Sequence, residues 1–72
     1  MLTADTITDE QIRDLRDSLN REHRGRAGKT RIQGALVMCG EALRADERYR
    51  GARHNARAYC AGFINERESR KP

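Results

Sequence analysis

The stretch Ile7-Thr-Asp-Glu-Gln-Ile-Arg-Asp-Leu-Arg16 contains the start of a helix and indicates a helical fold. Thr8 is a favourable N-cap residue, and Gln11 follows it at the spacing of a capping box, in which each side chain bonds the other residue's backbone N–H. Ile7 and Ile12 occupy the two positions of a hydrophobic staple. We therefore expect a helix from about residue 8 to about residue 24, before the next glycines.

This first helix is amphipathic. Ile12, Leu15 and Leu19 recur at helical spacing and mark the face that should be buried. On the other face, acids and arginines stand four residues apart, which predicts ion pairs along the helix. The expected pairs are Asp9–Arg13, Arg13–Asp17 and Asp17–Arg21.

Two more helices are expected downstream. Thr30 can cap a helix over about residues 30–45, and the wide apolar arc of this segment predicts a central position. The run from Gly34 to Gly40 also fits a short buried strand, but the helix formers after it and the lack of a partner strand favour the helix. Asp46 is a candidate N-cap for a third helix, which begins at about residue 47 or 52 and ends at about 68.

The predicted fold is all-α, a compact three-helix domain that spans the whole chain of 72 residues. Residues 1–7 and 69–72 are expected to be flexible, and a chain of this length has room for only a thin core. The expected core residues are Ile12, Leu15, Leu19, Ile32, Leu36, Cys39, Leu43, Cys60 and Phe63.

Basic residues are spread unevenly along the chain. Residues 1–24 carry six acids against four arginines, whereas residues 25–72 carry eleven Lys or Arg against five acids. Two segments could therefore contact the phosphates of a nucleic acid or an acidic protein. A GC-rich coding sequence, or an ordinary solvated helix face, would produce the same arginine bias. The candidate contact residues are Arg24, Arg26, Lys29, Arg31, Arg44, Arg48, Arg50, Arg53 and Arg57.

The sequence contains no convincing catalytic or metal site, and no cofactor is expected. Gly28-Lys-Thr30 fits the end of a phosphate-binding loop, but His23 stands where that motif requires its first glycine, and a helix rather than a strand precedes it. Cys39, Cys60 and the two histidines, His23 and His54, lack the paired spacing of zinc ligands. The two cysteines fall on apolar helix stripes, so we interpret them as small buried residues, with a Cys39–Cys60 disulfide as an alternative.

Apolar runs are too short to span a membrane, and the first residues lack the pattern of a signal peptide. The expected location is therefore the cytoplasm, where both cysteines would be reduced.

The opening stretch, together with Val37-Met-Cys-Gly-Glu-Ala-Leu43 and Ala56-Arg-Ala-Tyr-Cys-Ala61, resembles short bacterial and phage-borne proteins of unknown function. The resemblance covers most of residues 7–66, and the chain departs from it by a longer, arginine-rich stretch at residues 47–55. It implies a small helical protein, often carried on mobile elements, and supplies no activity and no functional residues.

From these observations we expect a non-enzymatic binding module whose arginines contact nucleic-acid phosphates without sequence preference. One alternative is a protein-interaction factor, such as a phage-borne inhibitor or adaptor, that places the same arginine surface on an acidic partner. Another is a homodimer whose interface contains Val37 and Met38 on the second helix.

Overall fold

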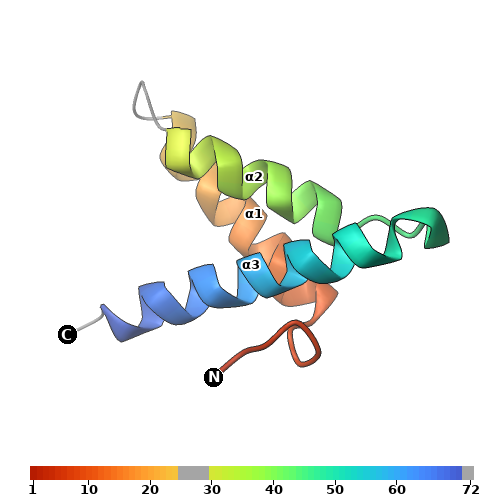
Figure 1. Ribbon diagram of the computed structural model, residues 1–72. Coiled ribbons are helices and arrows are strands. Elements are labelled where there is room, and N and C mark those ends of the chain that lie inside the picture. Colours follow the sequence, from red (N-terminus) through yellow and green to blue (C-terminus); the bar gives the residue numbers. More distant parts are fainter. Residues whose placement is uncertain (25–29, 71–72) are drawn as a thin grey trace.

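The computed structural model describes residues 1–24 and 30–70, and three α-helices account for most of them (Figure 1). They are α1 (Asp9–Arg24), α2 (Thr30–Ala42) and α3 (Arg50–Ser69). A single 3-10 turn, η1 (Glu47–Tyr49), precedes α3, and the described residues contain no strand. The all-α, three-helix prediction is confirmed.

The three helices pack around one another. α1 and α2 run antiparallel, while α3 lies beside α2 and crosses in front of the first part of α1 (Figure 1). α3 packs mainly against α2 and touches α1 much less, so α2 is the central helix, as its wide apolar arc predicts.

The capping box at the start of α1 is present. The Thr8 N–H donates to Gln11 Oε1 at 2.8 Å, and the Gln11 N–H donates to Thr8 Oγ1 at 3.1 Å. Ile7 and Ile12, the two staple residues, are both buried. The capping box and the two buried staple residues therefore confirm the predicted start of this helix.

The boundaries of the other two helices differ from the expected ones. α2 ends at Ala42 rather than near residue 45, because the N–H of Leu43 is shared between the carbonyls of Cys39 and Gly40 and the last turn tightens. Asp46 is an N-cap, but of η1, where its side chain accepts a hydrogen bond from the Arg48 N–H. α3 then begins at Arg50, between the two expected starting points.

The core is built from smaller residues than the sequence pattern predicts. Ile32, Leu36 and Leu43, expected in the core, are only partly buried. Buried alanines of α2 and α3 take their places, because small side chains let helix backbones approach closely and leave the larger ones at the rim. The expected residues that are buried are Ile12, Leu15, Leu19, Cys39, Cys60 and Phe63, and Ile7, Ala35, Ala42, Ala56 and Ala61 join them.

The N-terminal segment, expected to be flexible, is held against α3. A turn closes when the N–H groups of Thr6 and Ile7 donate to the Thr3 carbonyl at 3.2 and 3.0 Å. The Asn65 side chain then bonds both backbone groups of Leu2, since its Oδ1 accepts from the Leu2 N–H at 3.0 Å and its Nδ2 donates to the Leu2 carbonyl at 2.8 Å. The amide of Asn65 therefore pairs with this segment as a neighbouring strand would.

Arg57 of α3 bonds residues at the start of α1 and at the end of α2. Its guanidinium donates to Asp9 Oδ1 at 2.7 Å, to the Ile7 carbonyl, and to the Ala42 carbonyl at 3.4 Å. One side chain of α3 thereby contacts the start of α1, the segment before it and the last residue of α2. Only 20% of the Arg57 side chain is exposed.

We expect Arg57→Ala to lower the free energy of unfolding by about 2 kcal/mol, because hydrogen bonds from a charged donor are stronger than neutral ones and two carbonyls lose their donor. Arg57→Lys should lie between wild type and Arg57→Ala, since an ammonium keeps the charge without the fork of donors. Urea denaturation followed by circular dichroism measures the three proteins. Arg50→Ala on the same helix is the matched control, because Arg50 is exposed and makes no ion pair in the described part of the chain. Equal losses in Arg57→Ala and Arg50→Ala would contradict this role.

Candidate functional site

The arginines expected to face a partner are for the most part paired with carboxylates of the chain itself. Arg24 ends α1, and its side chain, like Arg26 and Lys29, lies outside the residues that the structure describes. Arg50 alone among the others has no ion pair within residues 1–24 and 30–70. The observed pairs are Arg31–Glu66 at 2.8 Å, Arg44–Glu41 at 3.1 Å, Arg48–Asp46 at 2.9 Å, Arg53–Glu47 at 3.6 Å and Arg57–Asp9 at 2.7 Å.

The ion pairs expected along α1 are not among those formed. Asp9 bonds Arg57 of α3 instead of Arg13 one turn away, because the fold brings a partly buried guanidinium to the start of α1. The sequence spacing predicts neighbours on one helix, but it contains no information about a partner on another.

Arginines of the stretch between α2 and α3 stabilise that connection. The Arg44 guanidinium lies over the Tyr49 ring at 4.0 Å from its centroid, with Arg48 at 5.9 Å. Arg53 donates to the Arg44 carbonyl at 2.9 Å and is only 21% exposed. Cation–π contacts and charge-assisted bonds thus hold the turn that leads into α3.

Three carboxyl groups have lowered pKa values because an arginine bonds each of them. Arg57 lowers the pKa of Asp9, Arg48 lowers that of Asp46, and Arg31 lowers that of Glu66. The lowered pKa values follow from these ion pairs, in which each carboxylate neutralises the arginine beside it.

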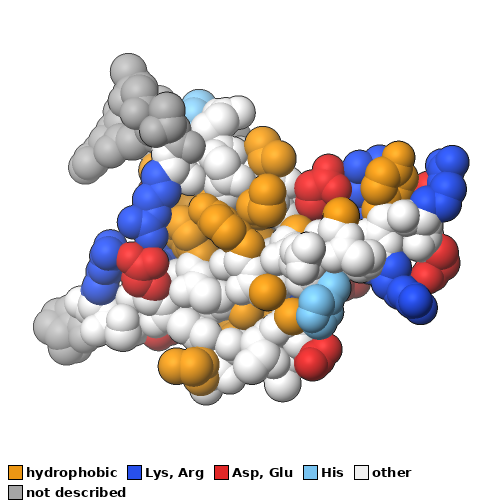
Figure 2. Space-filling model, viewed as in Figure 1, with side chains coloured by type: hydrophobic (Ala, Val, Ile, Leu, Met, Phe, Trp, Pro, Cys, Tyr) orange, Lys and Arg blue, Asp and Glu red, His pale blue; other side chains and the backbone are white. Residues whose placement is uncertain are grey.

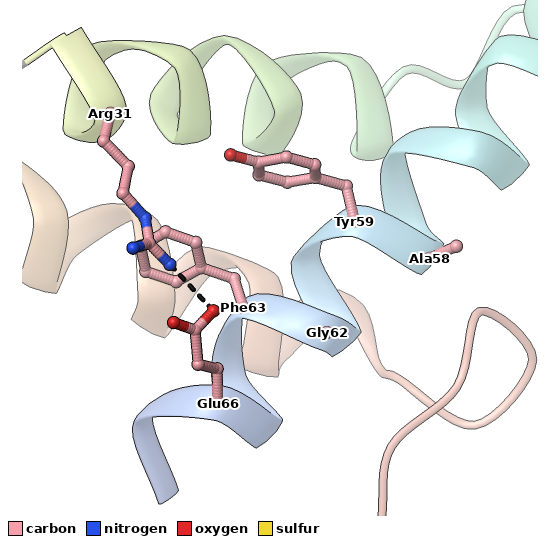
Figure 3. A pocket seen from close by; sticks show the side chains of 6 residues that line it. All are labelled: Arg31, Ala58, Tyr59, Gly62, Phe63 and Glu66. Atoms are coloured by element: carbon pink, nitrogen blue, oxygen red, sulfur yellow. Dashed lines mark hydrogen bonds and ion pairs between the residues drawn. The ribbon is translucent and has the colours of Figure 1, made fainter. Parts of the chain in front are cut away.

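Apolar side chains gather in the hollow between α2 and α3 (Figure 2). This hollow has a volume of about 350 Å³, and Figure 3 shows Arg31 reaching into it from α2 while Tyr59, Phe63 and Glu66 line it from α3. The rings of Tyr59 and Phe63 stack with centroids 6.3 Å apart. Phe63 is 7% exposed and forms the floor, whereas Tyr59 is 42% exposed and offers its ring to solvent.

One end of this hollow has a cationic rim. Arg31 and Arg67 approach the Phe63 ring to 5.2 and 4.9 Å from its centroid, and Arg67 also binds Glu22 of α1 through two hydrogen bonds. Arg31 and Arg70 both bind Glu66. Two guanidinium groups therefore share one carboxylate, which leaves an excess positive charge beside an apolar floor.

Of the residues that line this hollow, Arg31 was a candidate contact residue and Phe63 an expected core residue, whereas Tyr59 and Glu66 were not predicted. A signal was present, because Tyr59, Phe63, Glu66 and Arg70 recur at steps of four, three and four and so share one face of α3. What the sequence could not supply is that α2 lies beside this face without covering it.

The cysteines and histidines weighed as zinc ligands do not form a metal site within the described residues. The described part of the chain contains no group of three or more His, Cys, Asp or Glu side chains that could hold a metal ion. Cys39 and Cys60 are free thiols, both buried, as their apolar stripes predict. Of the pair expected at a dimer interface, Val37 is 53% exposed, whereas Met38 packs partly against the core.

None of the helices in the described residues is long and apolar enough to cross a membrane. Comparisons with protein-family models, with curated proteins and with solved structures found no match to this chain.

We expect Asp9→Asn to change how stability depends on pH. A carboxyl whose pKa is lowered in the folded state contributes stability above its unfolded pKa of about 3.9, and this contribution is lost as the pH falls through the folded pKa. The variant should therefore unfold at lower urea than wild type at pH 7, and the two midpoints should converge as the pH falls through the lowered pKa of Asp9. The difference should be small, because Asp9 is largely exposed and solvent screens the pair.

Glu10→Gln is the control for this comparison, since Glu10 also lies in the first turn of α1, where the helix dipole favours negative charge. Identical pH profiles for Asp9→Asn and Glu10→Gln would show that the dipole, and not Arg57, accounts for the effect.

Proposed function

We propose that the protein is a non-enzymatic interaction module that binds an acidic, apolar segment of a partner protein in the hollow between α2 and α3. The observation that carries this proposal is the exposed Tyr59 ring, stacked on Phe63 beside two arginines that share a single carboxylate. Aromatic and arginine side chains are the residues most enriched among the energetic centres of protein interfaces.

The geometry favours a helical occupant. An amphipathic helix presents apolar residues at i, i+3 and i+4, which matches a hollow bounded by two helices. The apolar residues of the partner would cover Tyr59 and reach toward Phe63. An acidic residue of the partner would lie at Arg31 and Arg70, where Glu66 leaves one guanidinium charge unbalanced.

Charge pairing makes this proposal preferable to the binding of nucleic-acid phosphates. A phosphate would have to displace a carboxylate of the chain from Arg44, Arg48 or Arg53, and each exchange replaces one ion pair by another. Arg57 is occupied by the fold itself. The resemblance to phage-borne proteins fits an inhibitor or adaptor that acts on a protein of the host.

A peptide-display selection on the purified protein tests the proposal. We expect the enriched peptides to combine apolar residues at helical spacing with Asp or Glu, and we expect Tyr59→Ala to weaken their binding about tenfold or more. Arg31→Ala should weaken acidic peptides more than neutral ones. Arg50→Ala, which removes an exposed arginine outside the hollow, should leave the affinity unchanged.

Three outcomes would contradict the proposal. Enrichment of peptides without acidic residues would remove the role of Arg31, and binding that survives Tyr59→Ala would place the site elsewhere. Salt-dependent binding of duplex DNA in a mobility-shift series, unaffected by Tyr59→Ala, would favour phosphate contact instead. Sedimentation of the protein as a dimer that Tyr59→Ala dissociates would show that a second copy, not a different partner, occupies the hollow.

A further inference from the structure

Two thiols face each other in the core, one from each of the helices that form the hollow. The Sγ atoms of Cys39 in α2 and Cys60 in α3 lie 4.0 Å apart, and the Cys60 S–H donates to the Cys39 sulfur. Both residues are 0% exposed. They are 21 positions apart in the sequence, so a bond between them would close a long loop.

The surroundings of the pair suit a disulfide. A disulfide requires the two Cα atoms to lie within about 7 Å, which is closer than most helix pairs approach. Ala35 and Ala42 flank Cys39 on its face of α2, and Ala56 precedes Cys60 by one turn of α3. These small side chains allow the close contact, and the sulfur-to-sulfur hydrogen bond leaves no atom between the two thiols.

We propose that Cys39 and Cys60 are a site of oxidative modification, at which hydrogen peroxide converts the two thiols into an intramolecular disulfide that fastens α2 to α3. The Cys39 thiol gives up its proton, and its sulfur attacks one peroxide oxygen. The O–O bond breaks, water leaves, and Cys39 becomes a sulfenic acid. The Cys60 sulfur then attacks the Cys39 sulfur, the S–O bond breaks, and the hydroxyl leaves with the Cys60 proton as a second water. The thiols are oxidised by two electrons, and one hydrogen peroxide is reduced to two waters.

The direction of the hydrogen bond assigns the two roles. Because Cys60 donates to Cys39, the pKa of Cys39 is lowered and that of Cys60 is raised. The thiolate is the reactive form of cysteine, so Cys39 is the sulfur that meets the peroxide and Cys60 is the one that resolves the sulfenic acid.

Burial sets the rate of this reaction. Since neither sulfur is exposed, peroxide reaches Cys39 only when α2 and α3 separate locally, and oxidation is slower than at a surface thiol. Once formed, the bond fixes the spacing between the two helices that bound the hollow.

The test is peroxide treatment of the purified wild-type protein in buffer without denaturant. The protein is then unfolded, alkylated with iodoacetamide and weighed intact by mass spectrometry. We expect a monomer that has lost two hydrogen atoms and takes up no alkyl group. Dithiothreitol should return it to the thiol form, and before reduction it should unfold at a higher urea concentration than the reduced protein. Under the same treatment Cys60→Ser should retain oxygen on Cys39 and show no increase in its unfolding midpoint.

If Cys60→Ser fails to fold, the measurements on the wild-type protein alone test the proposed disulfide. The proposal is overturned if native wild-type protein gains oxygen atoms without losing hydrogens, forms disulfide-linked dimers, or does not react at peroxide concentrations that oxidise an unfolded control. It is equally overturned if the intramolecular disulfide forms only in urea concentrations above the unfolding midpoint, because the folded pair would then not be the reacting species.

Discussion

The Arg57 guanidinium links α3 both to the start of α1 and to the end of α2. The last carbonyls of a helix have no hydrogen-bond donor inside the helix. The carbonyls of the residues just before a helix also need donors from elsewhere. Arg57 donates to one carbonyl of each kind, Ala42 at the end of α2 and Ile7 before α1. Its positive charge also suits the negative end of the α2 dipole and the carboxylate of Asp9. Shifting α3 along α2 would break these bonds together, so Arg57 contributes to the register of α3 at three points at once.

Much of the arginine bias of the chain is explained by arginines that bond or cover other parts of the fold. Two pairs, Arg31–Glu66 and Arg67–Glu22, connect α3 to the other two helices, while Arg44 and Arg53 hold the connection before α3. A single exposed ion pair stabilises little, but planar guanidinium groups also lie over apolar rings and cover part of a thin core. A net charge of +4 is therefore weak evidence for nucleic-acid binding in this chain. The uncovered aromatic surface beside α2 is the more specific feature.

Local features of this fold could be predicted from the sequence, whereas pairings between helices could not. The capping box at Thr8 depends on residues three apart, and the apolar stripes depend on helical spacing, so both can be read directly. The choice of Asp9 as the partner of Arg57 depends on how α3 crosses α1, which no spacing encodes. The alanines of the α2–α3 contact were missed because size, rather than hydrophobicity, decides which residues fit between closely packed helices. The hollow around Tyr59 depends on how α2 lies beside α3, and its sequence signals were Arg31 of α2 and one face of α3.

The pairing of Leu2 with Asn65 has a consequence for how the chain acquires its structure. These residues are separated by 63 positions, and Ile7 and Arg57 by 50, so the beginning of the protein depends on its final helix. During synthesis, the antiparallel pair of α1 and α2 is complete in sequence well before α3 exists, but its first residues have no partner until then. Contacts between distant positions carry the largest loop-closure cost and slow folding relative to local ones. A nascent chain that lacks α3 therefore lacks the side chains that bond the backbone of Leu2 and Ile7, and it leaves uncovered the side of α2 that packs on α3.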